Sequence, residues 1–275
     1  MPTATDNIVT NSSNVIEEEN RPYANIDMSV ELIKNKDFDC KTQYSDEFYK
    51  DYISNFKQNP KKKLVYRFIK RSVDLLASLL SLIILSPIFI LVAIAIKIDD
   101  PKGPVFFNQK RMGKGGRVFN CLKFRSMKTD APRDCATSVF ENPEIFYTRV
   151  GRFLRKTSID ELPQLFCCLI GTMSIIGPRP LVLTEEKCNN MRLALGAFRV
   201  RPGISGYAQV HGRDSVYYKN KAMLDAEYAN RISMLFDLKI IFYSVYVVLF
   251  RKGNDTKEKP SQADHSANET NISVG

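Results

Sequence analysis

A long uncharged run from Leu75 to Ile96 limits what this chain can fold into more than any other feature of its sequence. As a helix, its roughly 22 residues are long enough to span a bilayer core of about 30 Å. The simplest interpretation is a single membrane-spanning helix. Two observations favour a helix that enters the membrane, breaks and returns to the same side, although kinked spanning helices are also common.

Positive charge on both sides of the run is the first observation. Basic residues fill the segment 61–71 before it, and eight basic residues but no acidic one lie between Pro101 and Thr129 after it. Lysine and arginine beside a membrane segment favour the cytoplasmic side, so both flanks should stay there. Anionic lipid headgroups would attract each nearby cation by about 1 kcal/mol. We therefore expect the protein at the cytoplasmic face of the cell membrane, in contact with membrane lipids and with both termini cytoplasmic.

The pair Ser86-Pro87 near the middle of the run is the second observation. Proline lacks a backbone donor and clashes with the preceding turn, so it kinks a helix. A serine hydroxyl can donate to a carbonyl that the kink frees. These residues predict a re-entrant helix–break–helix over residues 72–97, with the break at Ser86 and Pro87.

Composition divides the chain into a central domain and two polar ends. The chain has 275 residues and a formal net charge of +10, which favours anionic partners. Residues 1–58 and 253–275 are polar, and we expect disorder in both, with a loose helix near 45–56. Residues 59–252 should hold the working domain. Because no recognised nucleic-acid reader motif occurs there, we expect no nucleic-acid partner.

Hydrophobic spacing within that domain predicts an α+β fold that is mostly helical. Short strands at 105–109 and 118–123 should form a hairpin around the glycine-rich turn at 113–116. Helical spacing begins at Arg149, and apolar residues between 235 and 249 form one face of a late helix. That face could pack in the core or lie at a membrane interface as an amphipathic helix, and we favour the interface.

Cysteine and histidine usage argues against a metal site built from these residues. The chain has six cysteines and two histidines, and no two cysteines form a C-x-x-C pair. The spacing matches no zinc template. We expect a reducing compartment, in which the adjacent cysteines 167 and 168 pack as small core residues with free thiols.

An adjacent acid pair, Asp160-Glu161, is the strongest candidate for chemistry. With Ser158 it also matches an S-x-x-E capping box before an apolar helix, and this structural interpretation stays open. The functional interpretation starts from the basic residues nearby along the chain or beyond the helix, which are Arg149, Arg152, Arg155, Lys156 and Arg179. Further candidates for phosphate binding are Lys123 and Arg125 in Lys-Phe-Arg-Ser-Met.

Such a set of residues suits the binding and transfer of a phosphate group. One carboxylate can attack phosphorus, as in enzymes that form an aspartyl phosphate. Its neighbour can hold Mg²⁺, which takes one or two protein carboxylates together with phosphate oxygens. Arginines bind phosphate oxygens in a bidentate manner and offset the repulsion between an anionic substrate and the acids.

Seven short motifs, in this order along the chain, resemble the bacterial sugar transferase family, the small monotopic phosphoglycosyl transferases. They are Lys-Arg-Ser-Val-Asp at 70–74, Ser-Pro at 86–87, Gly-Pro-Val-Phe-Phe at 103–107, Lys-Phe-Arg-Ser-Met at 123–127, Ile-Asp-Glu-Leu-Pro-Gln-Leu at 159–165, Met-Ser-Ile-Ile-Gly-Pro-Arg-Pro-Leu at 173–181 and Arg-Pro-Gly-Ile-Ser-Gly at 201–206. The resemblance covers residues 64–253, and so many motifs in order make it highly specific.

The resemblance implies an enzyme that transfers a phospho-sugar from a UDP-sugar to polyprenyl (undecaprenyl) phosphate, at the start of exopolysaccharide, capsule or other glycan assembly. Asp160 would be the nucleophile that forms a covalent aspartyl phospho-sugar and releases UMP. Glu161 would be the Mg²⁺ ligand, and Lys123, Arg155 and Arg179 would bind phosphate. The family's re-entrant helix, broken at a Ser-Pro pair, matches the membrane segment, and downstream glycosyltransferases would be partners.

Departures from the family's pattern leave details open. Tyr207 and His211 stand where tryptophan and asparagine are usual, and Thr172 replaces a common acid. The main alternative is a membrane-tethered scaffold or regulator without activity, and the intact acid pair argues against it. The sequence does not determine the sugar, the glycan pathway or the oligomeric state.

Overall fold

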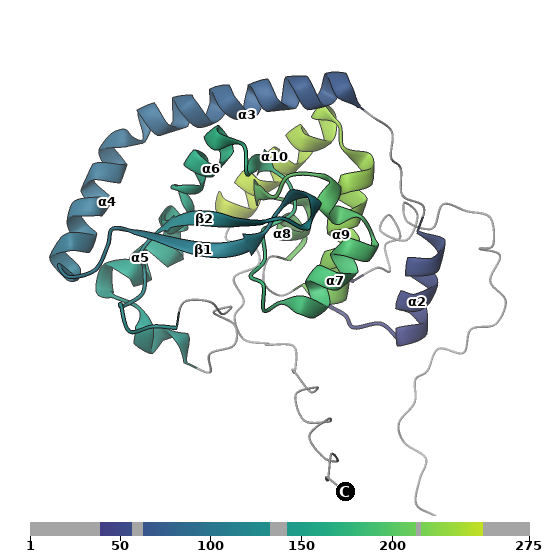
Figure 1. The fold of residues 1–275 in the computed structure, drawn as a ribbon, viewed down its shortest axis with the longest axis horizontal. Helices are drawn as coiled ribbons and strands as arrows, with labels where there is room; N and C mark the ends of the chain where they lie inside the picture. Colours follow the sequence, from purple (N-terminus) through teal and green to yellow (C-terminus); the bar gives the residue numbers. More distant parts are fainter. Residues whose placement is uncertain (1–38, 57–62, 133–141, 213–215, 250–275) are drawn as a thin grey trace, which may run out of the picture.

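The computed structural model describes residues 39–56, 63–132, 142–212 and 216–249 of the chain. It is mostly helical (Figure 1). The described residues also form two small two-stranded sheets. After two long helices and a hairpin, the elements are η3 (Pro143–Phe146), α5 (Arg149–Thr157), η4 (Ile159–Glu161), α6 (Gln164–Ile170), β3 (Ser174–Ile176), α7 (Glu186–Ala194), η5 (Ala197–Arg199), β4 (Gly203–Ser205), α8 (Tyr207–Gly212), α9 (Tyr218–Arg231) and α10 (Met234–Leu249). The predicted mostly helical class with a small sheet component is confirmed.

The two long helices, α3 (Leu64–Ile84) and α4 (Ser86–Asp99), meet at a bend of 60° (Figure 1). The Ser86 hydroxyl donates to the carbonyl of Ile83 at 2.7 Å. Pro87 lies in the first turn of α4, where a helix needs no backbone donor. The helix break thus lies at Leu85, directly before the predicted pair Ser86-Pro87, which begins α4. Within the described residues, no single helix is long and apolar enough to cross a membrane, whereas the bent pair meets that criterion together.

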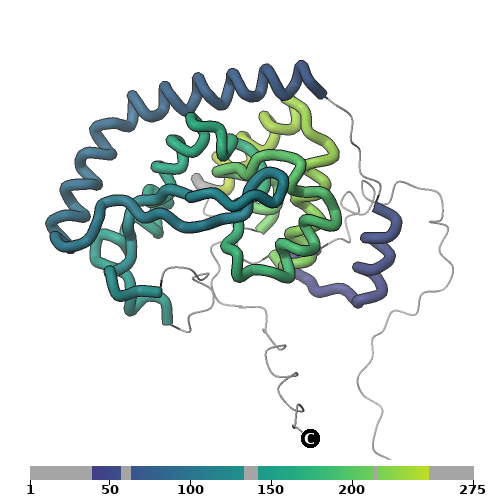
Figure 2. The backbone as a smooth tube through the Cα atoms, in the orientation of Figure 1, coloured from purple at the N-terminus to yellow at the C-terminus, as the bar shows by residue number. Residues whose placement is uncertain are grey.

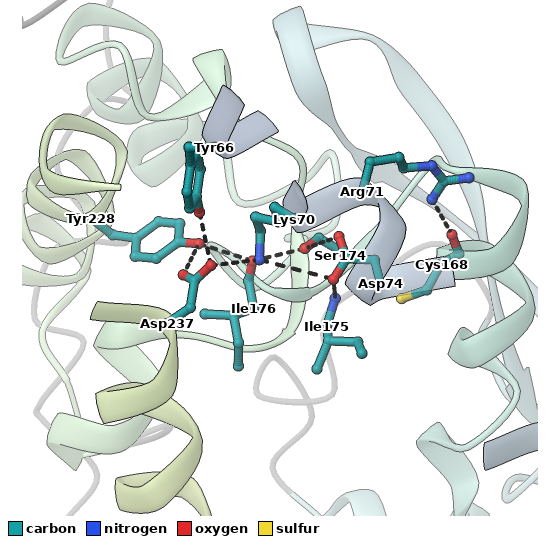
Figure 3. A network of polar contacts seen from close by, with 10 residues as sticks. All are labelled: Tyr66, Lys70, Arg71, Asp74, Cys168, Ser174, Ile175, Ile176, Tyr228 and Asp237. Atoms are coloured by element: carbon teal, nitrogen blue, oxygen red, sulfur yellow. Dashed lines mark hydrogen bonds and ion pairs between the residues drawn. The ribbon is translucent and has the colours of Figure 1, made fainter. Parts of the chain in front are cut away.

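One face of α3 is apolar and exposed, and the opposite face is polar and contacts the rest of the domain. The exposed apolar residues are Leu64, Val65, Phe68, Ile69, Val73, Leu76, Leu79, Leu80, Ile83 and Ile84. On the polar face, the Arg71 guanidinium donates to the carbonyl of Cys168 in α6 at 2.6 Å. Asp74 accepts from the Ser174 hydroxyl at 2.8 Å and from the Ile175 N–H at 3.1 Å (Figure 3). Polar contacts therefore fix α3 to the domain.

Asp237 of α10 provides a second anchor for α3 (Figure 3). The Tyr66 hydroxyl donates to its carboxylate at 2.8 Å, and the Lys70 ammonium donates at 2.9 Å. The hydroxyl of Tyr228 in α9 donates to its other oxygen at 2.7 Å. Lys70 also lies 3.9 Å from Asp74. One buried carboxylate thus connects α3, α9 and α10.

The predicted hairpin consists of β1 (Phe106–Met112) and β2 (Val118–Phe124), which pair in antiparallel fashion. Figure 2 traces the chain from the end of α4 into this hairpin, which runs back beneath α3. Its turn, η1 (Lys114–Gly116), ends in two glycines with φ of 69° and 71°, a region that glycine adopts without steric cost. The hairpin prediction is confirmed, although β1 continues beyond residue 109.

A second sheet, which no pattern in the sequence predicted, is the short parallel pair of β3 and β4. The two strands approach so closely that a Cβ atom on Gly203 would lie 2.1 Å from the nitrogen of Gly177. Glycine at both positions is therefore a steric requirement. The sheet brings the Gly-Pro-Arg-Pro segment at 177–180 beside the Arg-Pro-Gly-Ile-Ser-Gly segment at 201–206.

A packed helix, α2 (Asp46–Asn55), lies in a part of the chain that we expected to be disordered or loosely helical. Its Tyr49 and Tyr52 side chains are buried against η5 and α9. The Tyr49 hydroxyl donates to the Asn220 side chain at 2.9 Å. Tertiary packing of this kind stabilises a short helix that its own propensity would not. Residues 1–38 and 250–275, for which we also expected disorder, lie outside the described residues.

The apolar face predicted between residues 235 and 249 forms on α10 and is exposed. Its exposed residues are Leu235, Leu238, Ile241, Phe242 and Val245. On the other side of the helix, Ile240 is buried in a core cluster with Tyr228. The core-packing alternative therefore does not hold for this face, and its contact with a membrane stays a prediction.

Candidate active site

The acid pair lies where the chain changes direction between α5 and α6. Ser158 follows α5 and has a left-handed backbone conformation, with φ 59° and ψ 17°. Among the described residues it is the only non-glycine residue with positive φ. Such strain concentrates at functional sites, because surrounding structure must impose it. The helical pattern that begins at Arg149 is thus interrupted at Asp160 and Glu161, which lie in the short turn η4.

The capping-box interpretation of Ser158 and Glu161 is wrong. The Ser158 side chain makes no capping hydrogen bond to η4. Its backbone N–H donates to the carbonyl of Arg155 at 3.2 Å, so the Glu161 carboxylate does not accept it in the reciprocal bond of a capping box. The Glu161 carboxylate contacts two cations instead.

Two cations from distant parts of the chain hold Glu161. The ammonium of Lys123, near the end of β2, donates to Oε1 at 2.9 Å. Arg179 donates through Nη2 to Oε1 at 2.5 Å and through Nη1 to Oε2 at 3.1 Å. Burial alone would raise the pKa of Glu161, but attraction and hydrogen bonds from Arg179 and Lys123 hold that pKa well below its usual range. Glu161 is therefore a fixed negative charge.

The environment of Asp160 shifts its pKa in the opposite direction from that of Glu161. Its side chain is 6% exposed, and burial raises the pKa of Asp160 against the attraction of Lys123, Arg155 and Arg179. The negative charge of Glu161 also raises it. The hydrogen bonds that Lys123 and Arg179 donate at this site go to Glu161 and not to the Asp160 carboxylate. A buried carboxylate with a raised pKa is suited to attack an electrophile.

The structure brings Arg155 toward the acid pair but directs Arg125 elsewhere. Arg155 lies close enough to Asp160 to stabilise its charge, and its guanidinium lies 4.7 Å from the centre of the Tyr147 ring. The Arg125 guanidinium is buried against Asp100 at the end of α4, with Nη1 3.1 Å from the carboxylate and Nη2 donating to the carbonyl at 2.9 Å. The predicted contact of Arg125 with phosphate is therefore not supported by the position of its guanidinium.

Two arginines that no sequence motif marked as site residues hold the segment that carries Arg179. Arg111 Nη1 donates to the carbonyl of Pro180, and Arg192 Nη1 donates to the carbonyl of Arg179, both at 2.9 Å. Arg192 is 1% exposed. Its position in a polar stretch of sequence gave no indication of this burial, because the sequence does not distinguish a buried arginine from a solvent-exposed one.

The donors at the site limit the kind of metal that could bind. Within the described residues there is no group of three or more His, Cys, Asp or Glu side chains that could hold a metal ion. Asp160 and Glu161 supply carboxylate oxygens only. This set excludes a zinc-like cage but is compatible with a hard cation that takes most of its ligands from water and phosphate.

The site thus places the buried Asp160, whose pKa is raised, beside the ionised Glu161 and three cations. Lys123, Arg155 and Arg179 could neutralise a phosphate or diphosphate group. Asp160 could then approach phosphorus without the repulsion that two bare anions would have. The chemistry that this arrangement supports is nucleophilic displacement at phosphorus.

Comparisons with known proteins agree on one family. The family model described as bacterial sugar transferase matches residues 65–251. The chain is 41% identical over 195 residues to undecaprenyl-phosphate glucose phosphotransferase of Komagataeibacter xylinus, covering 66% of this chain and 36% of that protein. It is 37% identical over 199 residues to exopolysaccharide production protein ExoY of Sinorhizobium fredii, covering 67% and 87%. It is 38% identical over 190 residues to UDP-glucose:undecaprenyl-phosphate glucose-1-phosphate transferase of Escherichia coli K12, covering 66% and 40%.

The length of the match differs among these relatives. The chain spans less than half of the Komagataeibacter and Escherichia proteins, but most of ExoY. The matched region of 65–251 includes the acid pair and the cations around it. The chain therefore belongs to the bacterial sugar transferase family.

Proposed function

We propose that this protein transfers a phospho-sugar from a UDP-sugar to polyprenyl (undecaprenyl) phosphate, the initiating step of a glycan assembly pathway. The observation that carries the proposal is the geometry of the acid pair: Glu161 accepts hydrogen bonds from Lys123 and Arg179, and the neighbouring Asp160 is buried. In this arrangement the pKa of Asp160 is raised and that of Glu161 is lowered. Carboxylates whose pKa values are separated in this way take different roles in one site. Relatives named for sugar-phosphate transfer to undecaprenyl phosphate support the same reaction.

A donor screen tests the proposed function. Purified protein in detergent is given undecaprenyl phosphate, Mg²⁺ and, in separate reactions, UDP-glucose, UDP-galactose or a UDP-N-acetylhexosamine. UMP release that depends on the protein is expected with at least one donor. Absence of UMP release with every donor, from protein that retains a cooperative unfolding transition, would count against the proposal.

The proposed reaction has two displacements at the same phosphorus. In the first, an oxygen of the Asp160 carboxylate attacks the β-phosphorus of the UDP-sugar, the bond to the bridging oxygen breaks, and UMP leaves with its electron pair. In the second, a phosphate oxygen of the lipid attacks the aspartyl phospho-sugar and the Asp160 carboxylate leaves. The product is a diphosphate-linked lipid. Burial of Asp160 favours this path because it limits access of water to the acyl phosphate.

The surrounding cations have distinct roles in this scheme. Arg179 is 29% exposed at its side chain, so its guanidinium can reach a diphosphate that enters the site. Lys123 remains beside Glu161 and lowers the local negative charge. Arg155 lies near Asp160 and can stabilise charge on the transferred phosphate.

Mg²⁺ fits this site as a shared ligand of protein and substrate. Glu161 would hold it, because the cations beside it keep its carboxylate ionised, and Arg179 can exchange its carboxylate contacts for contacts with phosphate. When bound, the ion would neutralise charge on the diphosphate and on the departing UMP. Glu161 would keep its contact with Lys123 and so remain oriented toward the substrate.

Replacing Glu161 by Gln should therefore weaken the dependence on magnesium. The amide keeps the shape of the side chain but removes the charge, so we expect the Mg²⁺ concentration for half-maximal UMP release to rise on the order of 100-fold. The measurement is UMP release as a function of MgCl₂ concentration. Glu186→Gln, at an exposed glutamate at the start of α7, is the matched control and should leave the curve unchanged. An unaltered magnesium curve for Glu161→Gln would exclude Glu161 as the ligand.

We also propose that α3 and α4 form a re-entrant segment at the cytoplasmic face of the membrane. The 60° bend, the exposed apolar face of α3 and the basic residues on both flanks support this placement. The exposed apolar face of α10 would lie at the same interface.

Replacing Pro87 by Ala should straighten the segment toward a spanning helix, because alanine restores the backbone donor and removes the steric clash. A single reporter cysteine at position 65 or 102, in a cysteine-free background, is labelled from the cytoplasmic side. We expect position 102 to lose that labelling in Pro87→Ala but not in the control Pro101→Ala, which lies beyond α4. If both flanks stay accessible from the cytoplasm in Pro87→Ala, Pro87 is not the decisive break.

A further inference from the structure

A buried ion pair connects α7 and α9 to the segment that carries Arg179. Arg192 of α7 is 1% exposed and Asp225 of α9 is fully buried, and their side chains form an ion pair through Arg192 Nη2. The other terminal nitrogen of the same guanidinium, Nη1, donates to the backbone carbonyl of Arg179 at 2.9 Å. The Arg179 side chain in turn holds both oxygens of Glu161.

The chemistry of the Gly-Pro-Arg-Pro segment explains why it needs such a partner. Pro178 and Pro180 have no backbone N–H, so the segment around Arg179 can be tied to the fold mainly through its carbonyls. Donors must then come from other side chains. Arg111 supplies one at the Pro180 carbonyl, and Arg192 supplies one at the Arg179 carbonyl.

The ion pair itself is a costly way to fill the core. Removing both charges from water carries a large desolvation penalty, and apolar residues of the same volume would often be at least as stable. Arg192 Nε and Asp225 Oδ1 also have no hydrogen-bond partner within the described residues. The ion pair therefore adds little to the stability of the fold. What it does provide is a fixed hydrogen-bond donor, Arg192 Nη1, to the backbone carbonyl of Arg179.

We infer that Arg192 and Asp225 are positioning residues for Arg179. Asp225 orients the guanidinium of Arg192, and Arg192 fixes the backbone of Arg179 so that its side chain lies at Glu161 and at the entering diphosphate. This inference rests on the proposed function, because it assigns the pair a role in binding the phosphates of the nucleotide-sugar.

A double-mutant cycle between Arg192 and Arg179 tests the inference. We expect Arg192→Met to lower kcat/KM for the UDP-sugar on the order of 10- to 100-fold, mainly through a higher KM. In a chain that already carries Arg179→Met, the same change should cost less than about twofold, since the group that it positions is gone. If Arg192→Met lowers kcat/KM by the same factor in both backgrounds, its role is only structural and the inference fails.

Two further variants keep this test decisive. Arg192→Lys retains a charge for Asp225 but loses the planar fork that reaches two acceptors, so it should also raise KM, and it replaces Arg192→Met in the cycle if that variant does not fold. The control, Glu227→Gln, removes another fully buried carboxylate of α9, one paired with Arg231. It should lower the unfolding temperature without changing KM, and an equal rise of KM in this control would also overturn the inference. Failure of the proposed function would look different, because the unaltered chain would then release no UMP.

Discussion

Purified Asp160→Asn protein is expected to release UMP from a UDP-sugar at least on the order of 10⁴-fold more slowly than the unaltered chain, the size of effect seen when a catalytic nucleophile is removed. Asparagine has nearly the same shape but is a far weaker nucleophile toward phosphorus. Because Lys123 and Arg179 donate their hydrogen bonds to Glu161 and not to Asp160, replacement of Asp160 should leave the fold intact. The membrane contact that we propose for α3 should also be unchanged, since the exposed apolar face of this helix is not altered.

A direct test of this prediction measures radiolabel that becomes attached to the protein, not the release of UMP. Incubation with a UDP-sugar radiolabelled in the β-phosphate, with Mg²⁺ but without lipid acceptor, should leave label on the unaltered protein and none on Asp160→Asn. Asp130→Asn, at an exposed aspartate that follows β2, is the control and should label normally. Normal UMP release by Asp160→Asn would refute the assignment of the nucleophile.

Replacing Asp237 by Ala is expected to lower the free energy of unfolding by about 3 to 5 kcal/mol, the range for breaking a buried ion pair on one side. The change would leave the ammonium of Lys70 with only the more distant Asp74 and would remove the acceptor of the Tyr66 hydroxyl (Figure 3). Tyr228 would keep its contact with the carbonyl of Ile176. The loss should therefore detach α3 from α10 in particular.

Urea unfolding in detergent measures this effect, with the midpoint and slope compared for each variant. Asp46→Ala is the matched control, because Asp46 also pairs with a lysine, Lys219, but its side chain is 70% exposed. Water and salt screen such a surface pair, so no measurable change is expected. A similar loss of stability in both variants would show that burial of the Asp237 network does not matter.

Much of the architecture could be predicted because it depends on short stretches of backbone. The Ser86-Pro87 break follows from the missing donor of proline, and the hairpin follows from two apolar runs around a glycine-rich turn. The packed helix α2 was missed because its stability comes from two tyrosines buried against distant elements. Local propensity carries no information about such a surface.

The site was predicted as a set of candidates rather than as an arrangement. Several basic residues lie near the acid pair along the chain. Coulomb attraction alone does not tell which of them contacts which acid. The structure selects Lys123 and Arg179 for Glu161 and turns Arg125 toward Asp100. It also decides against a capping box, because the left-handed Ser158 ends the helix before the acids.

By itself, then, the sequence determined which backbone segments form and which side chains are able to perform phosphate chemistry, since both follow from residue type and near neighbours. Only the tertiary structure decided which cation meets which carboxylate and that Arg192 and Asp225 lie beneath Arg179. These contacts join residues that are far apart along the chain. Their geometry depends on how α3, the hairpin and α7 to α9 pack, and no local pattern encodes that packing.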